Sequence, residues 1–209
     1  YLPAAIYPWL PAKLESWMMD SGAFTAYTTG RPIDLYRYIR QCRFRLDNDP
    51  TLTEIIGLDA IGDHRTTMRN CDIMRIAGLP TIATVHYGAT VDEIKDVSSY
   101  DKVAIGGLVG RSPQEKRRFC DRVLSTLWPK RLHALGVFSE ALLMTFPFES
   151  ADCADWVRGP SSWGNMRSMR GLKVPHGAAK DLGAEIRWFL ELEAKLAARW
   201  RTTLVEVKS

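Results

Sequence analysis

The sequence predicts an α/β protein with a (β/α)8 TIM-like barrel, either complete or, in this chain, incomplete or trimmed at its N-terminus. Short apolar runs that end in Asp, Gly or His alternate with polar, helix-like segments through the 209 residues. This alternation is typical of right-handed βαβ units and a parallel sheet. The phosphate-binding loops of open doubly wound sheets, G-x-G-x-x-G and G-x-x-x-x-G-K-[ST], do not occur, which favours the barrel.

Composition indicates a globular protein in one domain spanning residues 1–209. Apolar residues make up 46% and charged residues 25%, and there is no internal repeat or linker-like stretch. The net charge of +4 permits a polyanionic partner without requiring one. No apolar run is as long as a membrane span and no signal-peptide pattern is present, so we expect a cytoplasmic protein with no membrane partner.

The cysteines indicate reduced thiols rather than a zinc site. They are widely spaced, without a C-x-x-C pair, at Cys42, Cys71, Cys120 and Cys153. The chain begins at Tyr1 instead of Met, so the natural N-terminus is open to question. Residues Tyr1 to Tyr7 are compatible with the remnant of a first strand.

The first half of the chain is predicted to alternate three strands with three helices. The strands are apolar or β-branched runs with a polar end, and the helices carry apolar residues at helical spacing. The predicted strands are 15–20, 55–59 and 81–86, and the predicted helices are 33–46, 64–77 and 91–97. Gly78 is a suitable C-cap for the second helix.

The second half continues the alternation. A strand over 102–105 leads into the glycine run Gly106–Gly110. Ser112, Pro113 and Glu115 have the spacing of a capped helix start, and the helix should extend to about Leu127. We then expect a strand over 131–137, a helix over 139–146, strand ends near 149–156 and 171–175, and a long amphipathic helix over 178–200.

Polar residues gather where the predicted strands end, which is where parallel barrels build their active sites. They are Asp20, Ser21, Asp59, Asp63, His86, Gly106, Gly107, Asp152 and Asp155. Several carboxylates at one barrel mouth repel each other and raise at least one pKa. Such a cluster suits either a divalent metal or a division of labour between a nucleophile and a general acid/base.

Some of these residues also have a structural interpretation. Asp63 and Asp155 fit a helix N-cap equally well. Asp20 does not, because Ser21 to Phe24 predict a tight loop rather than a helix. Taken alone, His86 is more typical of a core histidine and Phe24 of a core aromatic. Gly106 and Gly107 either permit close packing or allow a flat ligand to lie against the backbone.

Four segments, in order along the chain, resemble the tRNA-guanine transglycosylase superfamily. Asp20-Ser21-Gly22-Ala23-Phe24 is similar to its D-S-G-G-F signature, and Gly106–Gly110 to its G-G-L-x-V-G loop, one residue shorter. Leu135-Gly136-Val137 followed by Ser139 resembles its L-G-V-G turn, and Ala151-Asp152-Cys153 its F-D-C strand end. Segments 58–63, 85–88 and 150–156 are closer to the phage and bacterial branch that inserts 7-deazaguanines into DNA. The resemblance covers about residues 16–156.

The resemblance implies a base-exchanging glycosyltransferase that works by covalent catalysis without a cofactor or metal. Asp152 would be the nucleophile that attacks C1′ of the nucleotide, and Asp20 the general acid/base. Asp59 would accept the N1–H and amino protons of the guanine-like base, and His86 would contact its oxygen. The remaining substrate-binding residues would be Ser21, Phe24 as a stacking face, Gly106, and Gly107 with Leu108 through their backbone groups.

The implied partners are DNA, single-stranded or with a flipped base, and a 7-deazaguanine such as 7-cyano-7-deazaguanine. A homodimer is left open. The implied location is the cytoplasm of a bacterium or of a phage-infected host. The zinc subdomain of the tRNA enzymes is absent, because the segment 163–170 carries no zinc ligands, and this favours DNA over tRNA. The basic segments 37–45 and 158–173 would contact phosphates. Alternatively, 37–45 would be a solvated helix face and 158–173 a surface loop.

Three other functions remain open from the sequence. One is a transglycosylase-like enzyme acting on RNA. Another is a metal-dependent barrel hydrolase with Asp20, Asp59, His86 and Asp152 as ligands, and the third is a non-catalytic nucleic-acid-binding barrel. The choice of Asp152 over Asp155 as nucleophile rests on the family position alone.

Overall fold

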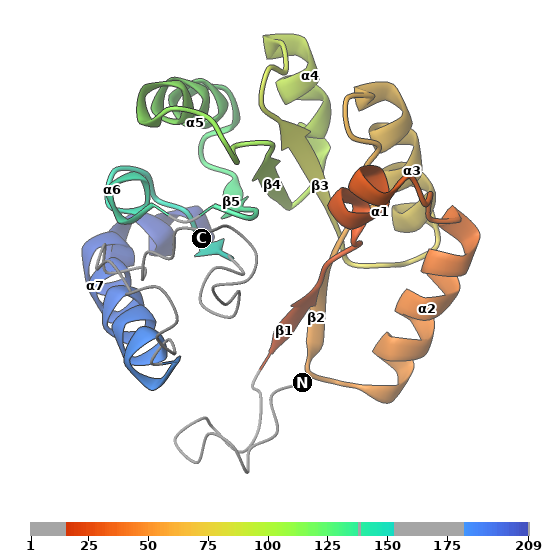
Figure 1. Ribbon diagram of the computed structural model, residues 1–209, viewed down its shortest axis with the longest axis horizontal. Coiled ribbons are helices and arrows are strands. Elements are labelled where there is room, and N and C mark those ends of the chain that lie inside the picture. The colour runs from red at the N-terminus through yellow and green to blue at the C-terminus, as the bar shows by residue number, and fades with distance from the viewer. Residues whose placement is uncertain (1–15, 138, 153–181, 209) are drawn as a thin grey trace, which may run out of the picture. The chain divides into compact units, whose positions relative to one another are not determined.

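The computed structural model describes residues 16–137, 139–152 and 182–208, and these form an α/β fold around one six-stranded sheet (Figure 1). The strands are neighbours in chain order, β1-β2-β3-β4-β5-β6. They are β1 (Trp17–Met19), β2 (Leu52–Ile56), β3 (Thr81–His86), β4 (Lys102–Gly106), β5 (Arg131–Ala134) and β6 (Ser150–Ala151).

The first four strands pair in parallel, as the alternating pattern predicts. Met19 pairs with Ile55, Ile56 with Ile82, and His86 with Gly106. Parallel neighbours in chain order require a crossover between each pair, which here contains helices. The α/β class is therefore confirmed, and the arrangement is compatible with an incomplete barrel. The count of eight strands stays a prediction.

The helices connect these strands. They are α1 (Ala23–Thr29), α2 (Leu35–Asn48), α3 (His64–Ile76), α4 (Val91–Asp96) with the 3-10 turn η1 (Val97–Ser99), α5 (Pro113–Leu127), α6 (Glu140–Leu143) and α7 (Leu182–Lys208). The chain divides into two compact units, Tyr1–His133 and Ala134–Ser209, with the boundary inside β5. Whether they form one domain, as the sequence predicts, stays a prediction. No described helix is long and apolar enough to cross a membrane.

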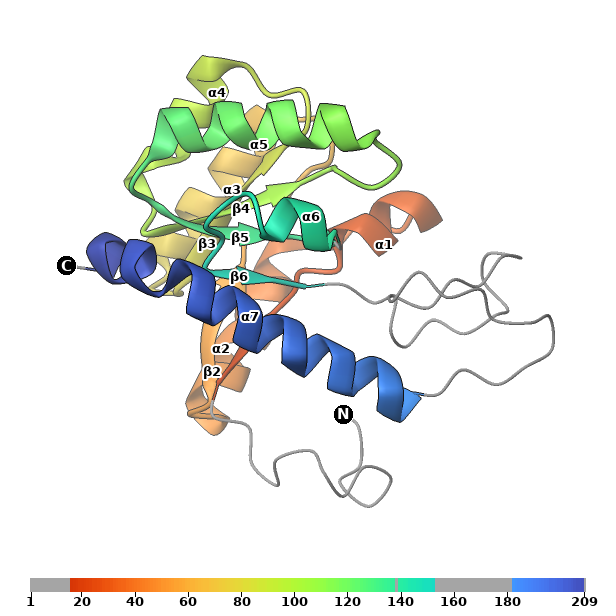
Figure 2. The same ribbon diagram turned by 90° about the vertical axis from the view of Figure 1, so that its left-hand side faces the viewer.

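In the first unit, α2 to α5 lie outside β1 to β4 (Figures 1 and 2). The strands β3 and β4 are almost wholly buried, which is typical of parallel strands covered on both faces. One core cluster joins Tyr38 and Cys42 of α2 to Ile55 of β2 and Met74 of α3. The polar strand ends therefore stand on a fixed apolar base.

An ion-pair cluster on the sheet indicates that the first unit is curved. Glu54 of β2 accepts from Lys102 of β4 at 2.7 Å and from Arg131 of β5 at 3.1 Å. Strands lie about 4.8 Å apart and their side chains stand roughly perpendicular to the sheet. Side chains two and three strands apart meet in this way where the sheet face is concave, as it is inside a barrel.

Helix starts follow the predicted capping chemistry. The Ser112 hydroxyl accepts from the Glu115 N–H while the Glu115 carboxylate accepts from the Ser112 N–H, which completes the predicted capping box of α5. Gly78 follows α3 with a φ of 78°, as expected for a C-cap. These local signals explain why the bounds of α3 and α5 match the prediction closely.

The tight loop predicted after Asp20 is wrong. Gly22, with a φ of 73°, turns the chain directly into α1, whose N-terminal Ala23 N–H donates to the Ser21 hydroxyl. Threonine hydroxyls in α1 bond back to carbonyls one turn earlier, and Gly30 closes the helix in the left-handed region. The segment lacks an apolar period, so its helical state depends on these caps.

In the second unit, α6 is tied to α7. The Trp200 indole N–H donates to the Leu143 carbonyl at 3.0 Å, and Lys195 lies 3.2 Å from Glu140. The predicted strand 131–137 ends at Ala134, because Gly136, with a φ of 62°, turns the chain. The predicted helix 139–146 covers only Glu140–Leu143. The predicted strand at 171–175 lies outside the described residues.

Candidate functional site

Three polar side chains from successive strand ends lie together, with Asp59 in contact with the other two, Ser21 and His86. Asp59 Oδ1 accepts from the Ser21 hydroxyl at 3.4 Å, and Asp59 Oδ2 lies 2.7 Å from His86 Nε2. Ser21 follows β1, Asp59 follows β2, and His86 ends β3. The Asp59 side chain is only 6% exposed. A buried carboxylate held by two polar partners is a recognition group for N–H donors.

The contact between His86 and Asp59 is close but poorly aligned. Although the two atoms are 2.7 Å apart, His86 Nε2 forms no hydrogen bond of acceptable direction with any described group. The two side chains are therefore in close contact without a well-aligned hydrogen bond, and the ring nitrogen is itself buried. The neighbouring Thr84 hydroxyl is buried and likewise makes no hydrogen bond to the described residues.

The charge of Asp59 also affects groups beneath it. Burial raises the pKa of the Cys71 thiol to about 12, and the negative charges of Asp59 and Asp72 add to the effect. Cys71 lies against Gly57, where a Cβ atom would approach its Sγ far inside contact distance. Gly57 therefore lets the strand end that leads to Asp59 pass over the thiol.

Gly106 and Gly107 are needed for packing around His86. A Cβ on Gly106 would lie 3.2 Å from Thr84 Cγ2 and 3.3 Å from His86 Nδ1. A Cβ on Gly107 would lie 3.1 Å from the Tyr87 backbone nitrogen, and Gly107 has a φ of 73°. Gly106 is buried, whereas Gly107 is exposed and can present its backbone to a ligand.

Leu108 and Phe24 have opposite environments. The Leu108 side chain is 1% exposed and belongs to the core, so only its backbone is available to a ligand. Phe24 lies on α1 and is 58% exposed, which contradicts the core interpretation. Tyr27, one turn later, is 65% exposed. The helix α1 therefore presents two aromatic rings to solvent next to the end of β1.

Asp20 is exposed at the end of β1, and its charge reaches Tyr38 of α2. Burial raises the pKa of Tyr38 above its ordinary value, and Cys42, Asp20 and Asp59 raise it further. The Tyr38 hydroxyl donates to the Ile56 carbonyl at 2.9 Å. Tyr38 thus stays neutral and holds the end of β2 between the two carboxylates.

Asp152 belongs to the second unit, where its carboxylate is anchored to a turn. Its Oδ1 accepts from the Gly136 N–H at 2.7 Å, and its own N–H donates to the Ala134 carbonyl at 3.2 Å. Asp152 is exposed. The contact joins two segments that resemble the same family separately, 135–137 and 151–153. Asp155 lies outside the described residues.

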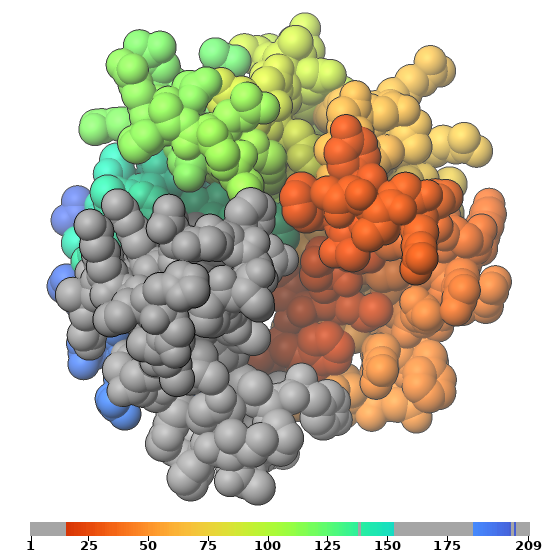
Figure 3. Space-filling model, viewed as in Figure 1, coloured from red at the N-terminus to blue at the C-terminus, as the bar shows by residue number. Residues whose placement is uncertain are grey.

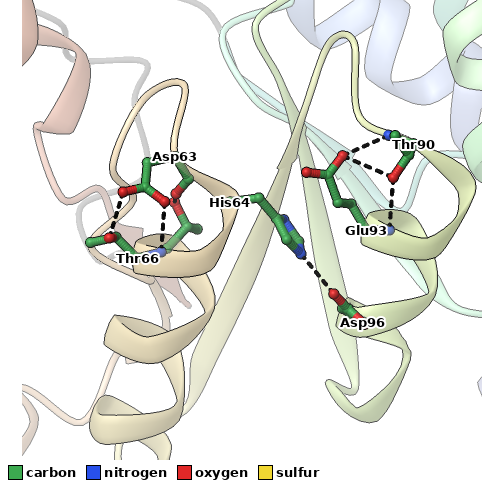
Figure 4. A network of polar contacts seen from close by, with 7 residues as sticks. Asp63, His64, Thr66, Thr90, Glu93 and Asp96 are labelled. Atoms are coloured by element: carbon green, nitrogen blue, oxygen red, sulfur yellow. Dashed lines mark hydrogen bonds and ion pairs between the residues drawn. The ribbon is translucent and has the colours of Figure 1, made fainter.

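Asp63 has a structural role. It is the N-cap of α3, accepting from the Thr66 backbone at 3.0 Å and from the Thr66 hydroxyl at 2.6 Å (Figure 4). These hydrogen bonds hold its pKa below the ordinary value. Figure 4 also shows His64 paired with Asp96 across α3 and α4 at 3.1 Å. Of the two interpretations of Asp63, the helix cap is the correct one.

Arg111, which lies beside the candidate site, had no individual signal in the sequence. Its guanidinium stacks on the Tyr87 ring at 4.4 Å, and the Tyr87 hydroxyl donates to Glu115 at 3.3 Å. Tyr87 follows His86 directly, in the segment 85–88 that resembles the family. The position of Tyr87 in that segment could have identified it as a candidate from the sequence. The contact with Arg111 is visible only in the folded structure.

Within the described part of the chain, no group of three or more His, Cys, Asp and Glu side chains is arranged to hold a metal ion. In the first unit the fold brings Ser21, Asp59, His86 and Gly106 together. Asp152 has its own surroundings in the second unit. Comparisons of this chain with family models, with curated proteins and with solved structures find no match.

Proposed function

We propose that the protein exchanges guanine in DNA for a 7-deazaguanine through a covalent intermediate. The Asp152 carboxylate attacks C1′ as the C1′–N9 bond breaks, and guanine leaves with the bonding pair on N9. Asp20 protonates the departing base. Asp20 then takes the N9 proton of the incoming base, whose N9 attacks C1′ and releases the Asp152 carboxylate.

The observation that carries the proposal is the buried Asp59 between Ser21 and His86. A guanine edge offers two adjacent N–H donors, and a carboxylate can accept both while keeping its other lone pairs for Ser21 and His86. The His86 ring, whose side chain is 23% exposed, would contact the base oxygen, as the family resemblance implies. This set matches a guanine-like base better than a generic polar ligand.

The surroundings of Asp152 support its role as nucleophile. A nucleophilic carboxylate must be held in one orientation while it remains accessible. The short bond from Gly136 fixes one oxygen, and the residue is exposed. Asp20 is also exposed, which suits a group that must exchange protons with successive bases.

The test is to trap the covalent adduct. Wild-type protein is incubated with a guanine-containing single-stranded oligonucleotide without an incoming base, then denatured and analysed for a protein–DNA band and released guanine. We expect both products from wild type, and neither above background from Asp152→Asn. With Asp20→Asn, we expect guanine release to slow about 100-fold or more.

Asp121→Asn is the matched control, because Asp121 is an exposed carboxylate on α5, and it should form the adduct normally. An adduct that survives Asp152→Asn and disappears in Asp155→Asn would move the nucleophile to Asp155. Equal guanine release from wild type and both variants would rule out the covalent mechanism. A stoichiometric metal required for activity would favour the hydrolase alternative instead.

A further inference from the structure

A groove lined by arginines lies next to the candidate site. It has a volume of about 550 Å³ and lies between Met19 at the end of β1 and one face of α2. The residues that α2 contributes are Arg37, Arg40, Gln41, Phe44 and Arg45. Their spacing of three or four residues places them on one helix face, away from the buried Tyr38, Ile39 and Cys42.

The three guanidinium groups of the groove make no direct bond to the described part of the fold, although the charge of Arg45 adds to the hydrogen bonds from Thr51 that lower the pKa of Asp49. Across the residues described, no hydrogen bond or ion pair engages the side chain of Arg37, Arg40 or Arg45, and none of the lining residues is acidic. Arg43 on the same helix, by contrast, donates to the Ala77 carbonyl at 2.9 Å. Arg75 is held by Asp72 at 3.0 Å. The groove therefore concentrates positive charge that forms no ion pair with the described residues.

Phe44 adds an apolar surface among these charges. Its side chain is 63% exposed, although the helix has a buried face that could have received an aromatic ring. Figure 3 shows the red surface around β1 set back beside the orange surface of α2. Exposed aromatic rings alternating with guanidinium groups are the usual surface for single-stranded nucleic acid, where rings stack on bases and arginines contact phosphates.

Met19, which lines the groove, directly precedes Asp20 in the sequence. We propose that this arginine groove binds the single-stranded DNA segment that flanks the reacting nucleotide. Arg37, Arg40 and Arg45 contact successive phosphates and Phe44 stacks on one base. This inference rests on the proposed function for the identity of the strand, and it adds where the strand lies. An acidic protein could also bind the arginines, but it has no nucleic-acid base that could stack on Phe44.

The test measures binding without chemistry. A guanine-free, fluorescently labelled 12-mer of A, C and T cannot undergo base exchange, so its anisotropy reports binding alone. We expect Arg37→Gln/Arg40→Gln/Arg45→Gln to weaken binding about tenfold or more, and to reduce the slope of log K against log salt by about 2, since each single-strand phosphate contact contributes about 0.7. Phe44→Ala should weaken binding about fivefold or more without changing the slope.

The control is Arg117→Gln/Arg118→Gln/Arg122→Gln on α5, which removes the same charge from exposed positions outside the groove. Equal losses in both triple variants would show a net-charge effect and overturn the proposal. Absence of binding by wild type would overturn it too, while guanine release from guanine-containing DNA would still test the proposed function separately. If the protein bound a polyglutamate peptide as tightly as the 12-mer, and Phe44→Ala had no effect, the ligand of the groove would be an acidic protein and not DNA.

Discussion

At the scale of single residues, Asp59 has the most constrained environment in the candidate site. A buried carboxylate is costly unless charged or polar groups surround it. Ser21 and His86 provide such groups, while the Asp59 charge adds to burial in raising the pKa of Cys71 and Tyr38. Such a carboxylate should therefore be specific in what it accepts.

Asp59→Asn should reduce activity and also specificity. The amide presents an NH2 donor to the N–H donors of the base and loses the charge. Because hydrogen bonds to charged groups contribute about 1.5–3 kcal/mol, kcat/KM on guanine-containing DNA should fall at least about tenfold. Hypoxanthine lacks the amino group, so kcat/KM on inosine-containing DNA should fall less than on guanine-containing DNA. The ratio of the two kcat/KM values, which measures the preference for guanine, should therefore decrease. Equal losses on both substrates would contradict base reading by Asp59.

The sequence predicted Asp59 and His86 because each ends an apolar run, and strand ends converge in a parallel sheet. It did not predict Tyr38, which occupies one of the apolar positions of an amphipathic helix. Only the folded structure shows that its hydroxyl reaches Ile56 and that burial raises its pKa, with Cys42, Asp20 and Asp59 adding to the effect. Thr84 was likewise hidden inside a β-branched strand.

At the scale of elements, the helix caps determine where α4 and α5 begin. Both start with a capping box, from Thr90 to Glu93 and from Ser112 to Glu115. The α5 box follows the glycine run at the candidate site, and Glu115 also accepts from Tyr87. The cap thus connects helix stability to the loop beside His86.

Ser112→Ala should destabilise the protein by about 1 kcal/mol at pH 7, measured by urea unfolding. Hydrogen bonds from Ser112 hold the Glu115 pKa below its ordinary 4.5. A carboxyl group whose pKa is lower in the folded state stabilises the fold at pH values above its unfolded-state pKa. This stabilisation is lost as the pH falls through the folded-state pKa. The gap between wild type and Ser112→Ala should therefore narrow below about pH 4.5. Ser98→Ala, at an exposed serine, should change little. A gap that widens in acid would contradict the cap.

The success of the sequence at this scale depended on the kind of signal. The bounds of α5 were predicted from Ser112 and Pro113, which act locally. The helix α1 was missed because its segment lacks an apolar stripe, and only the folded structure shows Gly22 and Gly30 in the left-handed region at its two ends. The predicted strand from Arg131 extended too far because Gly136 turns the chain before Val137.

At the scale of the whole molecule, the sheet of the first unit is curved, and its strand ends bring Ser21, Asp59 and His86 together. In the first unit this curvature is accompanied by the cluster of Glu54, Lys102 and Arg131 on β2, β4 and β5. The sequence could predict the parallel order from the alternation of elements. It could not predict the cluster, because its members are far apart in sequence and each resembles an ordinary polar residue at a strand start.

Glu54→Gln should therefore cost far more than an ordinary charge removal. Lys102 is 5% exposed, and the variant removes the carboxylate charge that lies 2.7 Å from its ammonium group. Breaking a buried ion pair from one side costs about 3 kcal/mol or more, seen as a lower urea midpoint with an unchanged m-value.

Asp92→Asn is the control, because its pair with Lys95 is exposed at 94% and 64%, and it should cost less than about 0.5 kcal/mol. The double variant Glu54→Met/Lys102→Met should regain part of the loss, because it also removes the buried Lys102 charge, while Arg131, whose side chain is 35% exposed, keeps its access to water. Equal, small losses for Glu54→Gln and Asp92→Asn would mean that the cluster is not a stabilising element of the curved sheet.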